Sequence, residues 1–91
     1  MSATVRIPTI LRTYTGGATE VSAQGASLQD VIASLEAQFA GIGARVLDEQ
    51  GQLRRFVNIY VNDDDVRFLD GLATPVAEGA SISIIPAVAG G

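Results

Sequence analysis

The chain has no cysteine, histidine, lysine or tryptophan among its 91 residues. Without cysteine it can form no disulfide, and it offers neither a thiol nucleophile nor a thiolate metal ligand. Without histidine it lacks the commonest zinc ligand, the usual proton shuttle and the usual partner of a catalytic serine. Without lysine it can contain no Walker-type phosphate loop and form no lysine Schiff base. These routes to catalysis by the chain's own side chains are therefore excluded.

Basic side chains are also scarce: all six are arginine, against ten aspartate and glutamate residues. The formal charge of −4 and the pI near 4.4 argue against nucleic acid and anionic membranes as partners. The N-terminus shows no basic segment followed by an apolar run, so no signal peptide is predicted. No apolar run approaches the length that spans a bilayer. We expect a cytoplasmic protein.

Apolar residues, by contrast, are plentiful enough for one core. They make up 47% of the chain and charged residues 18%, which is typical of a globular protein. The 91 residues are too few for two independently stable domains. We predict one domain at residues 1–86, followed by a flexible tail at residues 87–91, where small residues follow no pattern.

The apolar pattern predicts one main helix between two groups of strands. Ser27 is the expected N-cap, apolar residues follow at helical spacing as far as Phe39, and Gly41 or Gly43 is expected to end the helix. A short helical turn is expected within residues 42–53. Strands are predicted at residues 4–7, 19–23, 56–61, 66–68 and 81–85. This order predicts an α+β fold, a mixed sheet packed on one helix, with the first and last strands as parallel neighbours.

Three short motifs have ordinary structural interpretations. The run Gly41-Ile42-Gly43 begins like a dinucleotide-binding loop, but it follows a helix and Val46 replaces the third glycine. The polar residues 62–65 lack the glycine and the distant glutamate of a calcium loop, which favours a solvated turn. The pair Arg54-Arg55 has two interpretations, a solvated pair before a strand or a patch for an acidic partner.

Apolar residues on the outward side of two strands predict a docking patch. In the last strand Ile82 and Ile84 alternate with serines, so Ile85 points outward, next to Pro86 at the base of the tail. Phe56 and Tyr60 lie on the outward side of their own strand by the same argument. Together they predict a partner-docking surface. The alternative is that single exposed apolar residues are ordinary and that the loop at residues 42–53 covers Phe56.

The chain ends in Gly90-Gly91, which alone is a weak signal. Its ordinary interpretation is a frayed end. Its functional interpretation is that a terminus without side chains can be threaded through a narrow channel into a partner's active site. Ala87, Val88 and Ala89 would then be the other threading residues, and the Gly91 carboxylate would be the reacting group, activated by another protein.

Six segments that span essentially the whole chain resemble a known family: IPTILR at 7–12, YTGG at 14–17, FVNIYVND at 56–63, DVRF at 65–68, GLAT at 71–74 and IIPAVAGG at 84–91. They are similar to the ubiquitin-like sulfur carriers of the MoaD/ThiS family. The opening segments and the run at residues 56–68 are most similar to its CysO-like branch, the carriers of cysteine biosynthesis in actinobacteria.

The resemblance implies a β-grasp fold and a protein-borne sulfur donor that is not itself an enzyme. It implies an E1-like adenylating enzyme that uses ATP to activate the Gly91 carboxylate, and a sulfur donor that converts the acyl adenylate to a thiocarboxylate. A PLP-dependent cysteine synthase would accept the sulfur, and a zinc metalloprotease would release the product. ATP, PLP and zinc would thus belong to partner enzymes, with no cofactor or metal bound by this chain.

Three alternatives stay open at this point. The chain could supply sulfur to another pathway, for molybdopterin, thiamine or a thiolated natural product such as a thiosugar. It could be a ubiquitin-like modifier joined to protein lysines. It could also be a plain β-grasp binding module with incidental glycines. The absence of lysine fits a carrier that avoids attack on its own activated terminus, but the interpretation that we favour is a genomic bias toward arginine.

Overall fold

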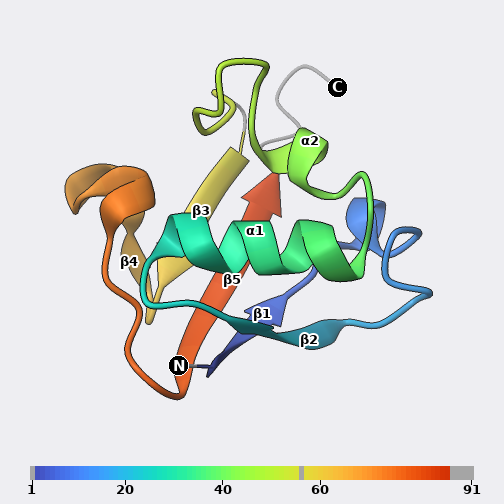
Figure 1. Ribbon diagram of the computed structural model, residues 1–91, viewed down its shortest axis with the longest axis horizontal. Helices are drawn as coiled ribbons and strands as arrows, with labels where there is room; N and C mark the ends of the chain where they lie inside the picture. The colour runs from blue at the N-terminus through green and yellow to red at the C-terminus, as the bar shows by residue number, and fades with distance from the viewer. Residues whose placement is uncertain (1, 56, 87–91) are drawn as a thin grey trace.

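Five strands form one mixed sheet in the order β2-β1-β5-β3-β4 (Figure 1). The structure is a computed structural model that describes residues 2–55 and 57–86. The strands in chain order are β1 (Ser2–Arg6), β2 (Glu20–Gln24), β3 (Val57–Val61), β4 (Asp64–Asp65) and β5 (Ala80–Pro86). β1 and β5 are parallel, whereas the other neighbouring strands are antiparallel. The predicted pairing of the first and last strands is confirmed.

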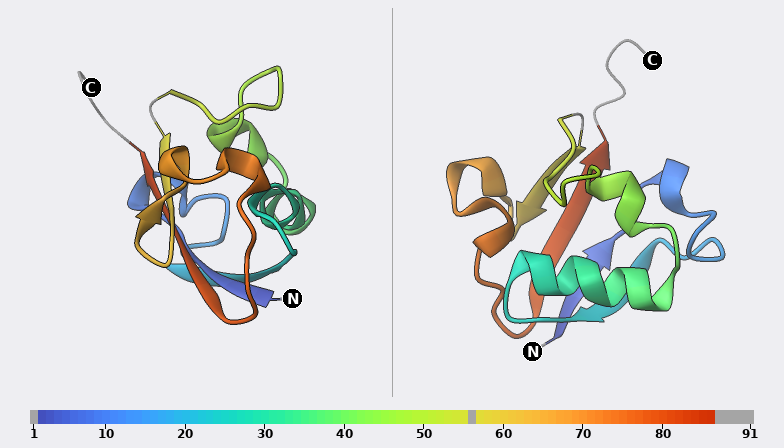
Figure 2. Two further views of the ribbon diagram at one scale, coloured as in Figure 1. Left: turned by 90° about the vertical axis from the view of Figure 1, so that its left-hand side faces the viewer. Right: turned by 45° about the horizontal axis from the view of Figure 1, so that its top comes forward.

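The main helix, α1 (Leu28–Gln38), packs on one face of this sheet (Figure 2). It begins as predicted, because the Ser27 hydroxyl accepts a hydrogen bond from the backbone N–H of Asp30 at 3.3 Å. Its apolar side and the inward residues of the strands form one core. The most deeply buried large side chains are Ile7, Leu28, Leu35, Ile42, Ile59 and Ile82. The other face of the sheet presents polar residues, such as the exposed Thr4 and the half-buried Ser83.

A carboxylate organises the chain after α1. The helix ends at Gln38, before either glycine that was expected to end it, and α2 (Gly43–Val46) follows as the predicted short helical turn. Between them the Glu36 carboxylate accepts hydrogen bonds from the backbone N–H groups of Gly41 at 2.9 Å and Gly43 at 2.8 Å. These two bonds lower the pKa of Glu36, because they stabilise its charged form.

The strand predicted at residues 66–68 is wrong, because η2 (Val66–Phe68) is a short 3-10 helix. Asn62 and Asp63 both have positive φ, 51° and 75°, and make the two-residue turn of a tight hairpin. The pairing strand is therefore β4, directly after the turn. The Asp65 carboxylate then accepts a hydrogen bond from the backbone N–H of Arg67 at 2.8 Å, which caps η2. A second 3-10 helix, η3 (Gly71–Ala73), follows, and η1 (Thr9–Leu11) lies between β1 and β2.

The helices of the described residues are all short for a lipid environment. Across 2–55 and 57–86, none has the length and apolar character needed to cross a bilayer.

Candidate functional site

The candidate site is the end of the sheet at which β5 finishes. Here Pro86, the last described residue, pairs with Val57, the first residue of β3 (Figure 1). The predicted reacting group, Gly91, and the predicted threading residues Ala87, Val88, Ala89 and Gly90 lie outside the described residues, as does Phe56. Their roles stay predictions. What the structure does describe is the surface from which residues 87–91 continue.

The prediction that Ile85 points outward is confirmed. Ile84 is 4% exposed and faces the core, whereas Ile85 is 48% exposed on the opposite side of β5. In the antiparallel register Ile85 is directly opposite Asn58 on β3. An exposed isoleucine beside the chain's continuation is well placed to contact any protein that receives the C-terminus.

Tyr60 lies on the same face of the sheet as Ile85, as predicted. It alternates with the buried Ile59 and Val61, and it is itself half-buried rather than fully exposed. Tyr60 is opposite Ser83, which lies two residues before Ile85 on the same strand, so Tyr60 and Ile85 are diagonal neighbours across the two strands. Residues in such diagonal positions are typically separated by about 7–8 Å. Two members of the predicted docking patch are therefore adjacent. Pro86 is placed only by its backbone pairing, so its part in the patch stays a prediction.

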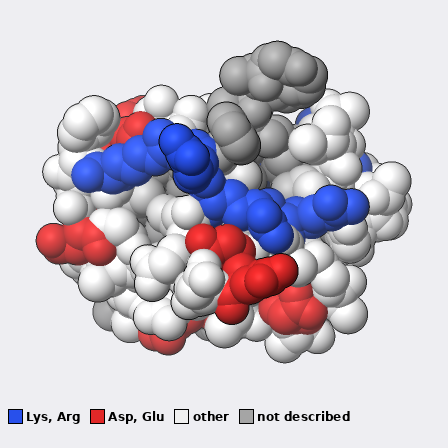
Figure 3. All heavy atoms as spheres, turned by 90° about the horizontal axis from the view of Figure 1, so that it is seen from above, with Lys and Arg blue, Asp and Glu red and all other residues white. Residues whose placement is uncertain are grey.

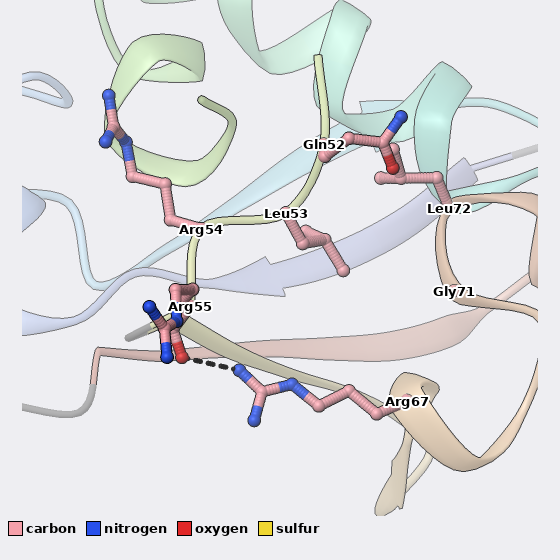
Figure 4. Close-up of a pocket in the computed structure, with 7 residues that line it drawn as sticks. All are labelled: Gln52, Leu53, Arg54, Arg55, Arg67, Gly71 and Leu72. Atoms are coloured by element: carbon pink, nitrogen blue, oxygen red, sulfur yellow. Dashed lines mark hydrogen bonds between the residues drawn. The ribbon is translucent and has the colours of Figure 1, made fainter. Parts of the chain in front are cut away.

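Three arginines gather beside this patch, at the start of β3. Arg54 and Arg55 lie just before the strand, and Arg67 reaches them from η2 (Figure 4). The Arg67 Nη2 donates hydrogen bonds to the backbone carbonyls of Arg55 at 2.9 Å and Val57 at 3.0 Å. The Arg54 Nε donates to the carbonyl of Ala44, in α2, at 2.9 Å. The sequence pair was recognised, but Arg67 was missed because it is 12 residues from Arg55.

A shallow hollow of about 450 Å³ accompanies these arginines. Its lining consists of the three arginines with two leucines and two small or polar residues, Gln52, Leu53, Arg54, Arg55, Arg67, Gly71 and Leu72. In Figure 4 the side chain of Arg67 extends toward the backbone carbonyl of Arg55, while that of Arg54 extends toward α2. The hollow combines positive charge with the half-buried apolar surface of Leu53 and Leu72.

Acidic side chains offer no obvious metal centre in the part of the chain described. Within residues 2–55 and 57–86 no three Asp or Glu side chains come together in a group that could hold a metal ion. The polar turn at residues 62–65, set aside as a calcium loop on spacing, is the tight hairpin described above. The candidate site of the described residues is thus a protein surface from which the chain terminus continues.

Comparison with known proteins agrees with this geometry. The family model described as ThiS family matches residues 5–91, which is nearly the whole chain and includes the terminal glycines. The chain belongs to the ThiS family. It is a ubiquitin-like β-grasp protein of the sulfur-carrier class, so the predicted family and fold are confirmed.

Individual relatives make the assignment more specific. Sulfur carrier protein CysO of Mycobacterium tuberculosis is 59% identical over 93 aligned positions, which cover 100% of both chains. The crystal structure of M. tuberculosis CysO matches with a TM-score of 0.91 at 58% identity, over 94% of this chain and 99% of that one. A chain of the Amycolatopsis orientalis BexX/CysO complex matches with a TM-score of 0.92 at 53% identity, over 98% and 99%.

A more distant relative has a different printed role. Small archaeal modifier protein 3 of Haloferax volcanii is 41% identical over 66 residues, covering 72% of this chain and 71% of the relative.

Proposed function

We propose that this chain carries sulfur as a C-terminal thiocarboxylate on Gly91 and donates it to a PLP-dependent cysteine synthase. The observation that supports this most is the full-length identity of 59% to a sulfur carrier protein CysO, together with a family match that extends through residue 91. The described structure adds an outward Ile85 one residue before the end of β5. The reaction would take place in the cytoplasm, where ATP is at hand.

The proposed chemistry needs no catalytic side chain on the carrier. A carboxylate is a poor electrophile, so an E1-like partner first joins Gly91 to AMP, using ATP and releasing pyrophosphate. The terminal sulfur of a persulfide donor then attacks the acyl carbon and expels AMP, which gives an acyl disulfide. A thiol of the donor enzyme or of a small-molecule reductant then attacks the donor's sulfur and breaks the S–S bond, so that the donor is left as a disulfide and Gly91 as a thiocarboxylate. A thiocarboxylate is more acidic than a thiol, so it is ionised and nucleophilic at neutral pH. This chemistry is compatible with a chain that has no cysteine and no histidine.

The later steps are also assigned to partners. The thiocarboxylate sulfur would attack an aminoacrylate held on PLP in the synthase, and the adduct would rearrange to an amide. A zinc metalloprotease would then cut that amide to release cysteine and regenerate the Gly91 carboxylate. The carrier thus acts as a co-substrate that is used and restored.

Intact mass of the protein isolated from its native cells tests the proposal. We expect a species heavier by the exchange of one oxygen for sulfur, and its appearance in vitro should require ATP, the adenylating enzyme of the same cells and a sulfur donor. Adding the synthase and its aminoacrylate-forming substrate should convert this species to a cysteine adduct. Failure to find a sulfur-bearing terminus in either setting would overturn the carrier function.

The modifier function remains a second candidate because of the 41% identity to small archaeal modifier protein 3. The same mass measurement separates the two functions. A modifier would appear in large conjugates in which its C-terminus is joined to lysines of other proteins, and a carrier would not. A carrier for another pathway would form the thiocarboxylate but would not yield the cysteine adduct with the synthase.

A further inference from the structure

The arginines of this acidic protein are concentrated at one end of the molecule. Seen from above, basic side chains form a band across the end of the molecule at which β5 finishes (Figure 3). Arg54, Arg55 and Arg67 belong to this end, because they surround the first residues of β3, which pair with the end of β5. We call these three residues the arginine stripe. A protein with a net charge of −4 thus presents a local positive surface beside its candidate site.

The arginines of the stripe form no ion pair within the described residues, although Asp48 lines a neighbouring hollow together with Arg54 and Arg55. The ion pair found in the described part of the chain joins Arg6 and Glu20 at 3.4 Å, and no carboxylate lies within ion-pair distance of the stripe. Arg54 and Arg67 donate instead to neutral backbone carbonyls, through Nε and Nη2 respectively. A guanidinium has five N–H donors, so most of the donors of these two side chains remain for a partner.

The backbone contacts also hold the stripe in place. Two hydrogen bonds fix the Arg67 Nη2 against Arg55 and Val57, and one fixes Arg54 against Ala44. A long side chain that is already ordered loses less conformational entropy when it binds a partner. Arg55 differs, because its exposed side chain makes no hydrogen bond within the described residues.

A direct role for the stripe in the acyl-transfer step does not fit its position. If residues 87–91 were fully extended, Gly91 would lie up to about 17 Å beyond Pro86. The stripe lies at the base of that segment, beside Val57, the partner of Pro86. Its position suits contact with the surface around the opening that receives the C-terminus.

We propose that the arginine stripe docks an acidic segment of the enzyme that adenylates the carrier, with an apolar side chain of that segment in the hollow between Leu53 and Leu72. The proposal rests on the proposed function, because it names the partner that would take the C-terminus first. Nucleic acid fits this surface less well, since the chain as a whole is negative and the hollow is partly apolar. Complementary charges at such a surface steer association and fix orientation.

Steady-state kinetics of carrier-dependent pyrophosphate release test the proposal, with the adenylating enzyme of the native cells as the probe. Arg55→Gln should raise the KM for the carrier about threefold to fivefold and leave kcat nearly unchanged. Arg55→Lys should restore most of the loss, because the charge returns. The difference between Arg55→Gln and wild type should shrink when salt is raised from about 0.05 M to 0.3 M.

Gln24→Glu is the matched control, because it produces the same net charge of −5 from −4 at the opposite end of the sheet, where Gln24 pairs with Ser2. It should leave the KM close to the wild-type value. An unchanged KM for Arg55→Gln, or an equal rise for Gln24→Glu, would overturn the stripe while leaving the carrier function intact. If the wild-type chain itself released no pyrophosphate, the proposed function would fall, and the stripe with it.

Discussion

Ile84 and Ile85 are neighbours of identical chemistry, and the structure uses them in opposite ways. Ile84 is 4% exposed and packs in the core, whereas Ile85 is 48% exposed on the outer face. The only difference between them is the alternation of side chains along β5. One strand therefore supplies the core with one of its faces and a candidate docking surface with the other.

The comparison separates the residues that stabilise the fold from the residues that we expect a partner to contact. All pairings of β5 with β1 and β3 lie within residues 80–86, and the proposed chemistry lies at residue 91. Changes on the inner face should lower stability, changes on the outer face should weaken docking, and changes at the terminus should abolish chemistry. The predictions below test whether these three effects are separable.

Deletion of Gly90 and Gly91 should have the largest effect. We expect complete loss of adenylation and thiocarboxylate formation, because the reacting carboxylate is displaced by two residues, with no measurable change in melting temperature. Carrier-dependent pyrophosphate release and thermal unfolding are the two measurements. A truncated chain that still stimulated pyrophosphate release would show that Gly91 is not the reacting residue.

Addition of one alanine after Gly91 should be almost as damaging to the chemistry. The carboxylate would move by about 3.5 Å, and a methyl group would lie next to the reacting carbon. Misplacement of this size costs about a hundredfold or more in rate. Binding to the adenylating enzyme, measured by calorimetry, should remain near normal while intact mass shows almost no thiocarboxylate. Efficient thiocarboxylation of the extended chain would rule out threading to a fixed point.

Exchange of each isoleucine for alanine should separate stability from docking. Ile84→Ala removes a buried side chain and should lower the free energy of unfolding by about 2–5 kcal/mol. Ile85→Ala should cost about 1 kcal/mol or less, mainly through strand propensity. Urea unfolding of both variants provides the comparison.

Docking of the two variants to the adenylating enzyme should be affected in the opposite order to their stability. Ile85→Ala should raise the KM for the carrier in pyrophosphate release, whereas Ile84→Ala, assayed at a temperature at which it is folded, should not. Equal losses of stability in the two variants would contradict the assignment of faces.

The sequence pattern along single segments correctly predicted the features that depend on strand alternation and on helix capping. The side that Ile85 faces follows from the serines around it, and the start of α1 follows from Ser27, whose hydroxyl makes the expected cap. The error at residues 66–68 came from Asn62 and Asp63, whose positive φ values reverse the chain in two residues. Apolar pattern does not encode that turn geometry.

The candidate site was predictable only in part, for a related reason. Ile85 and Tyr60 were found by parity within single strands, whereas the arginine stripe depends on a contact between η2 and the start of β3. A pattern read along the chain cannot show that Arg67 bonds to backbone carbonyls 12 and 10 residues away. The roles of the terminal residues follow from the family resemblance, and deletion or extension of the terminus tests them.

Glu36→Gln should have the smallest effect. Unlike Ile85→Ala, which should mainly weaken docking, it should lower stability and leave docking unchanged. The two glycine N–H groups lower the pKa of Glu36, so its stabilisation is fully present above the ordinary carboxyl value of 4.5 and is lost as the pH falls through the folded-state pKa. The two N–H groups bond different oxygens of the carboxylate, and an amide has only one acceptor oxygen, so one of the two bonds is lost unless the side chain moves. The variant should therefore melt below wild type at pH 7, and the gap should close on the acidic side of 4.5.

Glu49→Gln is the matched control for this change. It removes the same charge from an exposed position in the loop after α2, and its side chain makes no hydrogen bond within the described residues. Its melting temperature should follow that of wild type at both pH values, whereas that of Glu36→Gln should not. Because Glu36 is an exposed residue of α1, on the helical side of the sheet and not on the face that carries Ile85, its loss should leave the KM for the carrier unchanged at neutral pH. A raised KM would mean that the end of α1 and the docking surface are coupled, and the separation seen between Ile84 and Ile85 would then not extend to the rest of the fold.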